Sequence, residues 1–170
     1  YVKDILKAYL SQENQDCAEV FLLRDSGGYP NPFEGKKIKF HYCKTMPPQI
    51  GRLRLAASLL ACLWQRRPQQ VFCGHIKLAP LVRSLCQPLG IPYTVLTYGK
   101  EVWDSLPRSE QKALLQAKEI WTISRYSRDR ACAANDLNPE KVKILPCVVD
   151  GNTFTPGPKP SVLLERYGLT

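Results

Sequence analysis

Two groups of side chains in this sequence could bind or activate a polar substrate, and the first lies in residues 73–77. This segment contains His75 and Lys77, preceded by Gly74, which lets a ligand approach the backbone. A histidine can hydrogen-bond to a sugar hydroxyl or act as a base, and a lysine can attract phosphate. The alternative is a histidine that satisfies backbone carbonyl groups at a turn, beside a solvated lysine.

The second group lies in residues 98–101 and at Ser124. Tyr98 offers a phenol, Gly99 a permissive backbone, and Glu101 a carboxylate that can hold a hydroxyl-bearing acceptor. The alternative is a tight turn with surface charges. Ser124 begins a helical pattern, and a helix N-terminus with a hydroxyl cap can attract an anion. More commonly, a serine at this position is only the helix cap.

Apolar periodicity, prolines and glycines predict an alternation of strands and helices around these residues. The predicted strands span residues 18–23, 38–42, 71–74, 92–97, 120–123 and 142–145. The predicted helices span residues 1–11, 47–67, 78–89, 109–117, 124–135 and 161–167. Gly90 should cap the third helix and Ser109 should cap the fourth.

Alternating strands and helices predict right-handed crossovers and a doubly wound α/β fold with a mostly parallel sheet. In such sheets ligands bind beyond the carboxyl ends of the strands. His75 and Lys77 follow the third strand, the turn from Tyr98 follows the fourth, and Ser124 follows the fifth. We therefore expect these residues to share one edge of the sheet.

The long helix at 47–67 is the most apolar part of the chain. Its apolar side is predicted to contain Leu53, Ala56, Ala57, Leu60 and Leu63 or Trp64. Because this side recurs at helical spacing, we expect it to face the core. The basic residues Arg52, Arg54, Arg66 and Arg67 favour a further hypothesis, peripheral contact with a membrane.

Composition fits one globular domain of 170 residues, with 44% hydrophobic and 23% charged residues. The net charge of +9 favours an acidic partner in general. The basic residues are dispersed and resemble no nucleic-acid module, so we expect no nucleic-acid partner. Seven cysteines without close pairs suggest reduced thiols in a cytoplasm. With only two histidines and no Cys-x-x-Cys spacing, we expect neither a metal site nor a cofactor.

Several segments together resemble the amino-terminal domain of the family-four retaining glycosyltransferases, which have the two-domain GT-B fold. His75 matches the second histidine of the family's His-x-His strand end, and Glu101 matches the glutamate that follows a His-Gly pair in the family. Tyr98 stands where many relatives have that histidine, and Cys147-Val148 stands where Asn-Gly is usual. The resembling segments are residues 1–6, 70–80, 90–103, 120–130 and 141–158.

The resemblance implies that residues 1–150 are a Rossmann-like acceptor-side domain and that 151–170 lead toward a donor-binding domain. It also implies that the family's first strand precedes Tyr1, so that the chain is part of a longer protein and inactive alone. The whole enzyme would move a sugar from a nucleotide-sugar donor to a sugar or lipid-linked acceptor, with retention and without a bound metal. His75, Lys77, Tyr98, Gly99, Glu101 and Ser124 would then line the acceptor side of the cleft. The alternative is a non-catalytic Rossmann-like nucleotide-binding or interaction module.

Overall fold

The fold was determined as a computed structural model that describes residues 2–13, 17–35, 37–152, 154–158 and 161–168. The described strands are β1 (Ala18–Leu22), β2 (Ile38–Tyr42), β3 (Val71–Cys73), β4 (Tyr93–Leu96), β5 (Glu119–Thr122) and β6 (Val142–Ile144). The described α-helices are α1 (Val2–Ser11), α2 (Pro48–Arg66), α3 (Ala79–Cys86), α4 (Arg108–Gln116), α5 (Arg125–Asn135) and α6 (Ser161–Tyr167). These bounds agree with the predicted elements to within a few residues. The predicted helix start at Tyr1 lies outside the described residues.

The described strands form two parallel sheets. The larger sheet has the order β3-β4-β5-β6, and the smaller one pairs β1 with β2. Val95 at the centre of β4 lies opposite Cys73 of β3 on one side and Ile120 of β5 on the other. The predicted α/β class with parallel strands is confirmed.

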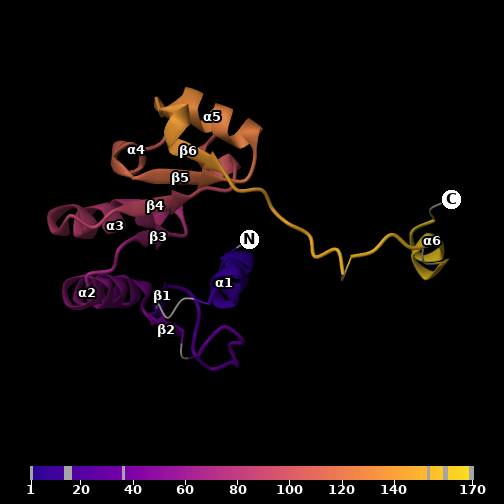
Figure 1. The fold of residues 1–170 in the computed structure, drawn as a ribbon, viewed down its shortest axis with the longest axis horizontal. Helices are drawn as coiled ribbons and strands as arrows, with labels where there is room; N and C mark the ends of the chain where they lie inside the picture. The colour runs from indigo at the N-terminus through magenta and orange to yellow at the C-terminus, as the bar shows by residue number, and fades with distance from the viewer. Residues whose placement is uncertain (1, 14–16, 36, 153, 159–160, 169–170) are drawn as a thin grey trace.

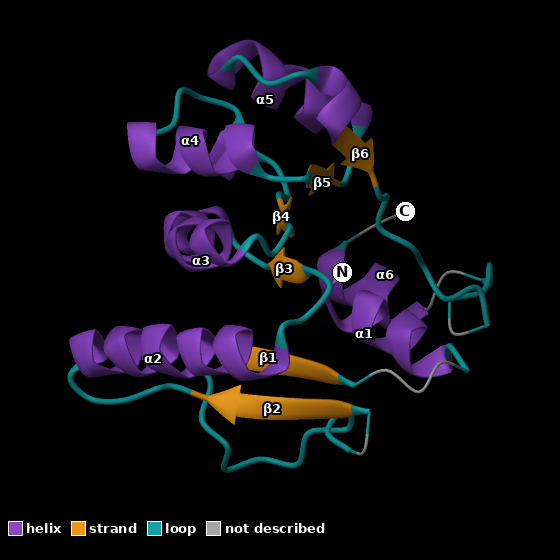
Figure 2. Ribbon diagram, turned by 60° about the vertical axis from the view of Figure 1, so that its left-hand side comes forward, coloured by secondary structure: helices purple, strands orange, loops and turns teal. Residues whose placement is uncertain are grey.

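The crossover helices lie on one side of the larger sheet. Figure 2 shows α3 and α4 on one side of the column of strands and α1 on the other. The connection from β1 to β2 is a long loop with turns, in agreement with its glycine and proline content. Parallel pairing requires such a crossover, because a tight hairpin would reverse the strand direction.

The core lies between the larger sheet and helices α2 to α5. Val95, Ile120 and Leu114 are fully or almost fully buried in it. On the opposite face of the sheet, the rings of Phe72 and Trp121 meet with their centroids 5.2 Å apart, although they belong to the two strands that flank β4. This aromatic pair helps to explain why β4 is buried along its whole length.

Of the predicted helix caps Gly90 and Ser109, the first is found in the structure and the second is not. Gly90 adopts a positive φ of 66° after α3 and a short 3₁₀ turn, as predicted for a left-handed cap. The predicted cap at Ser109 is wrong, because α4 begins one residue earlier, at Arg108, after Pro107. Proline ends the preceding segment and leaves the serine inside the first helical turn.

The prediction for the buried side of α2 is wrong except at Leu63, which was given as the alternative to Trp64 and is buried. Leu53, Leu60 and Trp64 are exposed. The buried residues of α2 are Gly51, Leu55, Leu59 and Leu63. Periodicity could not choose the buried side, because both sides of this helix carry leucines at helical spacing.

The chain leaves the body of the fold after β6. Figure 1 shows an extended segment that runs from β6 to α6, which stands apart from the rest of the molecule. The segment has the exposed apolar residues Val148, Val149 and Phe154. It matches the predicted proline-rich and glycine-rich connection. None of the described helices is long and apolar enough to cross a membrane.

Candidate functional site

Three turns come together at the carboxyl edge of the larger sheet. The first follows β3 and contains His75, the second follows β4 and contains Tyr98 to Glu101, and the third joins β5 to α5 at Ser124. The hydroxyl of Tyr98 donates a hydrogen bond to the carbonyl oxygen of Gly74 at 2.9 Å. The first two turns are therefore in direct contact.

The second turn is also joined to the third. Trp103 Nε1 donates to Ser127 Oγ in the first turn of α5 at 3.4 Å. Gly99 packs against the same two side chains, because a Cβ at this position would lie 3.3 Å from Trp103 and 3.8 Å from Ser127 Oγ. A side chain at position 99 would therefore require the Trp103 ring to shift slightly. We name the edge formed by the three turns the strand-end rim.

His75 presents one ring nitrogen outward. Its Nδ1 accepts a hydrogen bond from the backbone N–H of Lys77 at 3.1 Å, so in the neutral ring the proton is on Nε2. The side chain is exposed at the rim. A neutral His75 is thus arranged to donate a hydrogen bond to a ligand oxygen. Beneath it, the Cys73 thiol donates to the His75 carbonyl, and burial raises the pKa of Cys73 to about 11, which keeps this thiol neutral.

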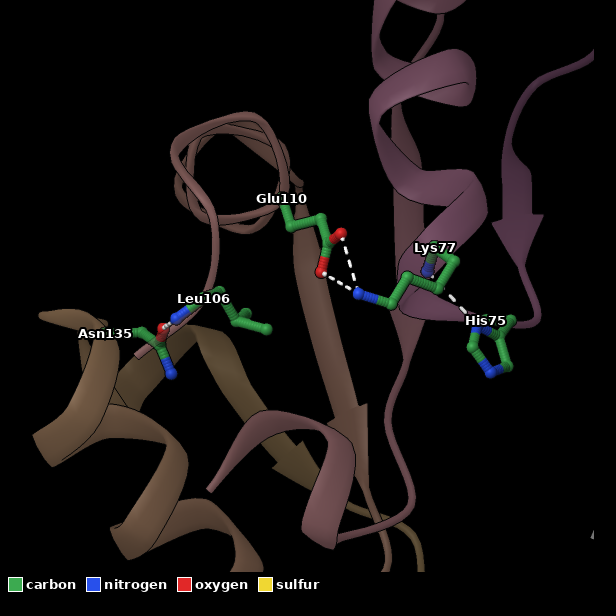
Figure 3. Close-up of polar contacts among 5 residues, drawn as sticks. All are labelled: His75, Lys77, Leu106, Glu110 and Asn135. Atoms are coloured by element: carbon green, nitrogen blue, oxygen red, sulfur yellow. Dashed lines mark hydrogen bonds and ion pairs between the residues drawn. The ribbon is translucent and has the colours of Figure 1, made fainter. Parts of the chain in front are cut away.

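The side chain of Lys77 extends away from the imidazole of His75. Its Nζ forms an ion pair with both carboxylate oxygens of Glu110, at 3.0 and 3.3 Å. Figure 3 shows the lysine extending toward Glu110 of α4 while the imidazole of His75 points the other way. Glu110 is buried, so Lys77 balances a charge that would otherwise be costly there. The ion pair of Lys77 with Glu110 therefore links the turn after β3 to α4.

The carboxylate of Glu101 is bound by its own turn. It accepts hydrogen bonds from the backbone N–H of Tyr98 and, at 3.0 Å, from that of Gly99. Tyr98 is half-buried, and burial with the nearby Glu101 raises the pKa of its phenol. Glu101 thus holds the shape of the turn that places Tyr98 and Gly99 at the rim.

Ser124 is the predicted cap of α5. Its Oγ accepts from the backbone N–H of Ser127 at 3.1 Å and donates to Ser127 Oγ at the same distance. The predicted cap is confirmed, and its hydroxyl is already engaged within the helix terminus.

Asn135, which was not predicted for the site, holds the segment after the second turn. The buried side chain donates to the carbonyl oxygens of Val102, Asp104 and Ala131 at 3.1 to 3.3 Å. Its Oδ1 accepts from the backbone N–H of Leu106 at 2.9 Å, as Figure 3 shows. The only sequence signal was an amide at the end of a helix, which does not reveal partners about 30 positions away.

Two aromatic residues near the rim were also missed. Trp103 and Tyr126 meet edge to face, with centroids 5.2 Å apart and planes at 88°. Tyr126 is exposed at the start of α5. A tryptophan and a tyrosine in a predicted loop and helix gave no reason to expect this pairing.

A pocket of about 380 Å³ lies at the opposite edge of the sheet. Its lining is Gln87, Ile91, Pro92, Tyr93, Gln116 and Lys118. Tyr93 is the first residue of β4, so this pocket lies at the amino ends of the strands. In parallel α/β sheets ligands bind at the other end, so the strand-end rim is the better candidate.

Comparison with known proteins supports the fold. No protein-family model matches the chain, and no curated protein matches it in sequence. Among solved structures, the apo form of the lipopolysaccharide outer core galactosyltransferase WaaB matches with a TM-score of 0.61 and 13% sequence identity. The match covers 87% of this chain and 41% of the galactosyltransferase. The chain thus spans less than half of that protein and has a Rossmann-like α/β fold consistent with one half of a GT-B fold.

Proposed function

We propose that this chain is the acceptor-side half of a retaining glycosyltransferase that moves a sugar from a nucleotide-sugar donor to a sugar or lipid-linked acceptor. The observation that carries the proposal is the meeting of three polar turns at the carboxyl edge of one parallel sheet. The likeness to part of a galactosyltransferase supports the same division of the enzyme into two halves.

In this proposal His75 binds the acceptor. Its Nε2–H donates to a hydroxyl of the acceptor sugar, while Nδ1 remains bound to the backbone of Lys77. Tyr98 and Gly99 form the floor beside it, and Glu101 positions that floor through its two backbone hydrogen bonds. Lys77 and Ser124 support the rim through Glu110 and Ser127.

The donor would be bound mainly by a second lobe. Charge that develops on the leaving diphosphate would be offset there by fixed positive groups and helix termini. The contribution of this half is orientation, because holding the acceptor hydroxyl against the donor converts a bimolecular encounter into an intramolecular one. We therefore expect the isolated chain to fold and to transfer no sugar.

The experiment compares the chain alone with a longer protein that also contains the second lobe. Release of nucleoside diphosphate is measured over a panel of nucleotide sugars and acceptors. Transfer is expected only in the longer protein. Turnover by the 170-residue chain alone would contradict the proposed division. Binding of a nucleotide by the chain, with no transfer in the longer protein, would favour a non-catalytic nucleotide-binding module.

The role of His75 is tested in the active longer protein. His75→Ala is expected to raise the acceptor KM about tenfold, the effect of one lost hydrogen bond. His75→Gln retains an N–H donor and should recover part of that loss. Lys118→Gln, at the far edge of the sheet, is the control and should change nothing. An unchanged acceptor KM in His75→Ala would remove this residue from the acceptor site.

A further inference from the structure

Helix α2 has a second apolar side that no other part of the described structure covers. Ile50, Leu53, Leu60 and Trp64 are 51%, 71%, 44% and 64% exposed. With Ala57 they recur at intervals of three and four residues, which places them on one side of the helix. We name this set the outer stripe. At 1.5 Å per residue it is about 21 Å long.

The segment of the chain that carries the outer stripe is basic. Residues 44–67 contain five cationic side chains and no aspartate or glutamate. Arg52 and Arg54 are exposed on α2 near Leu53. At the other end, the Arg67 guanidinium lies over the ring of Trp64, 5.4 Å from its centroid. An apolar line flanked by cations therefore extends along the whole helix.

An apolar stripe flanked by arginines favours some binding partners over others. A second copy of the chain would bring a second set of cations against the first, which is unfavourable. An anionic lipid surface offers both chemistries at once, because acyl chains accept the apolar side chains and phosphate groups attract the arginines. Tryptophan and arginine together also suit the boundary between water and lipid.

We propose that the outer stripe binds the surface of an anionic lipid bilayer, with α2 lying parallel to the membrane plane. Ile50, Leu53, Leu60 and Trp64 enter the acyl boundary, and Arg52 and Arg54 contact lipid phosphates. The association is peripheral and reversible. This inference does not depend on the proposed transferase activity, since binding is measured without any sugar donor.

The first experiment tests the apolar contribution by sedimentation of the full chain with vesicles. The vesicles contain phosphatidylcholine alone or phosphatidylcholine with phosphatidylglycerol. Binding is expected only to the anionic vesicles. The double variant Leu53→Gln/Leu60→Gln should reduce the partition coefficient at least about tenfold, since two apolar side chains no longer enter the lipid. Both positions are exposed, so the thermal unfolding of the variant should be unchanged.

Two matched controls separate the stripe from general surface properties. Leu115→Gln removes a leucine with similar exposure on α4 and should leave binding intact. Arg52→Gln/Arg54→Gln should weaken binding several-fold, whereas Lys112→Gln/Lys118→Gln changes the net charge equally and should not. Raising the salt concentration to about 1 M should weaken the arginine contribution.

A fluorescence measurement reports the position of Trp64 directly. Brominated lipids should quench the tryptophan emission of the wild-type chain, and most of this quenching should be lost in Trp64→Phe.

Several results would overturn the proposal. These are failure of the wild-type chain to bind anionic vesicles, wild-type binding by Leu53→Gln/Leu60→Gln, and equal loss in the two charge variants. A further contradicting result could come from analytical ultracentrifugation. If the chain forms a dimer that dissociates on Leu53→Gln/Leu60→Gln substitution, a second copy of the chain is the occupant of the stripe.

Discussion

At the scale of single residues, polar side chains that bind backbone groups hold the rim together. Glu101 accepts from two backbone amides of its own turn. Asn135 joins α5 to two carbonyl groups and one amide of the segment after that turn. Lys77 neutralises the buried Glu110. These residues position the turns, whereas His75 directs a polar group outward.

Asn135 gives a stability prediction at this scale. Asn135→Ala leaves the Leu106 N–H and the carbonyl groups of Val102 and Asp104 without this partner, so the free energy of unfolding should fall by about 2–4 kcal/mol. Asn135→Asp should cost at least as much, because a carboxylate cannot donate to those carbonyl groups. Urea unfolding measures both.

The control for this prediction is Asn138→Ala. Asn138 is exposed and its side chain accepts only from the Glu140 N–H, so its loss should cost about 1 kcal/mol or less. Equal effects at positions 135 and 138 would show that the Asn135 hydrogen bonds do not stabilise the fold.

At the scale of elements, α2 packs closely on the chain that precedes it. Gly51 lies in its first turns, where an added Cβ would be 2.7 Å from the carbonyl oxygen of Cys43. The farther end of the helix is joined to β1 by the Arg66 ion pair with Glu19, at 3.5 Å. Glu19 also contacts His41 of β2 at 2.9 Å. Helix α2 therefore lies close to the residue after β2 at one end and is joined to β1 at the other.

We predict that Gly51→Ala lowers the free energy of unfolding by about 1–3 kcal/mol. Alanine would gain about 1 kcal/mol in helix propensity, but the contact with rigid backbone requires α2 to shift. Gln49→Ala, at an exposed position nearby, should change stability by no more than about 0.5 kcal/mol. A stabilised Gly51→Ala variant would mean that α2 moves freely against residue 43.

The elements were largely predictable from sequence, because prolines and glycines delimit apolar runs of strand or helix length. The rim was predictable for the same reason, since neighbouring parallel strands must end at one edge. The buried side of α2 was not, because Leu53 and Leu55 belong to two competing apolar sides. The partners of Lys77 and Asn135 depend on tertiary contacts across about 30 positions, which local patterns do not contain.

At the scale of the whole molecule, residues up to β6 form one body and α6 stands beyond an extended connection, as Figure 1 shows. The domain boundary expected near residue 150 stays a prediction. Phe154 is 70% exposed in that connection.

Limited digestion with chymotrypsin should therefore cut first after Phe154 and leave a stable body. Exposed Trp64 and Tyr126 should resist, because helical backbone does not fit a protease without local unfolding. Phe154→Ala should remove the early cut, as followed by mass spectrometry. An earlier cut within the body would contradict the predicted boundary.

The order of strands in the larger sheet has a kinetic consequence. Among the described strands, β3, β4, β5 and β6 pair only with their neighbours along the chain, each through a single crossover. The sheet can therefore grow one strand at a time, with short loop closures at each step. During synthesis each new strand meets a finished edge as soon as its helix has emerged, so this half of the fold can assemble in the direction of translation.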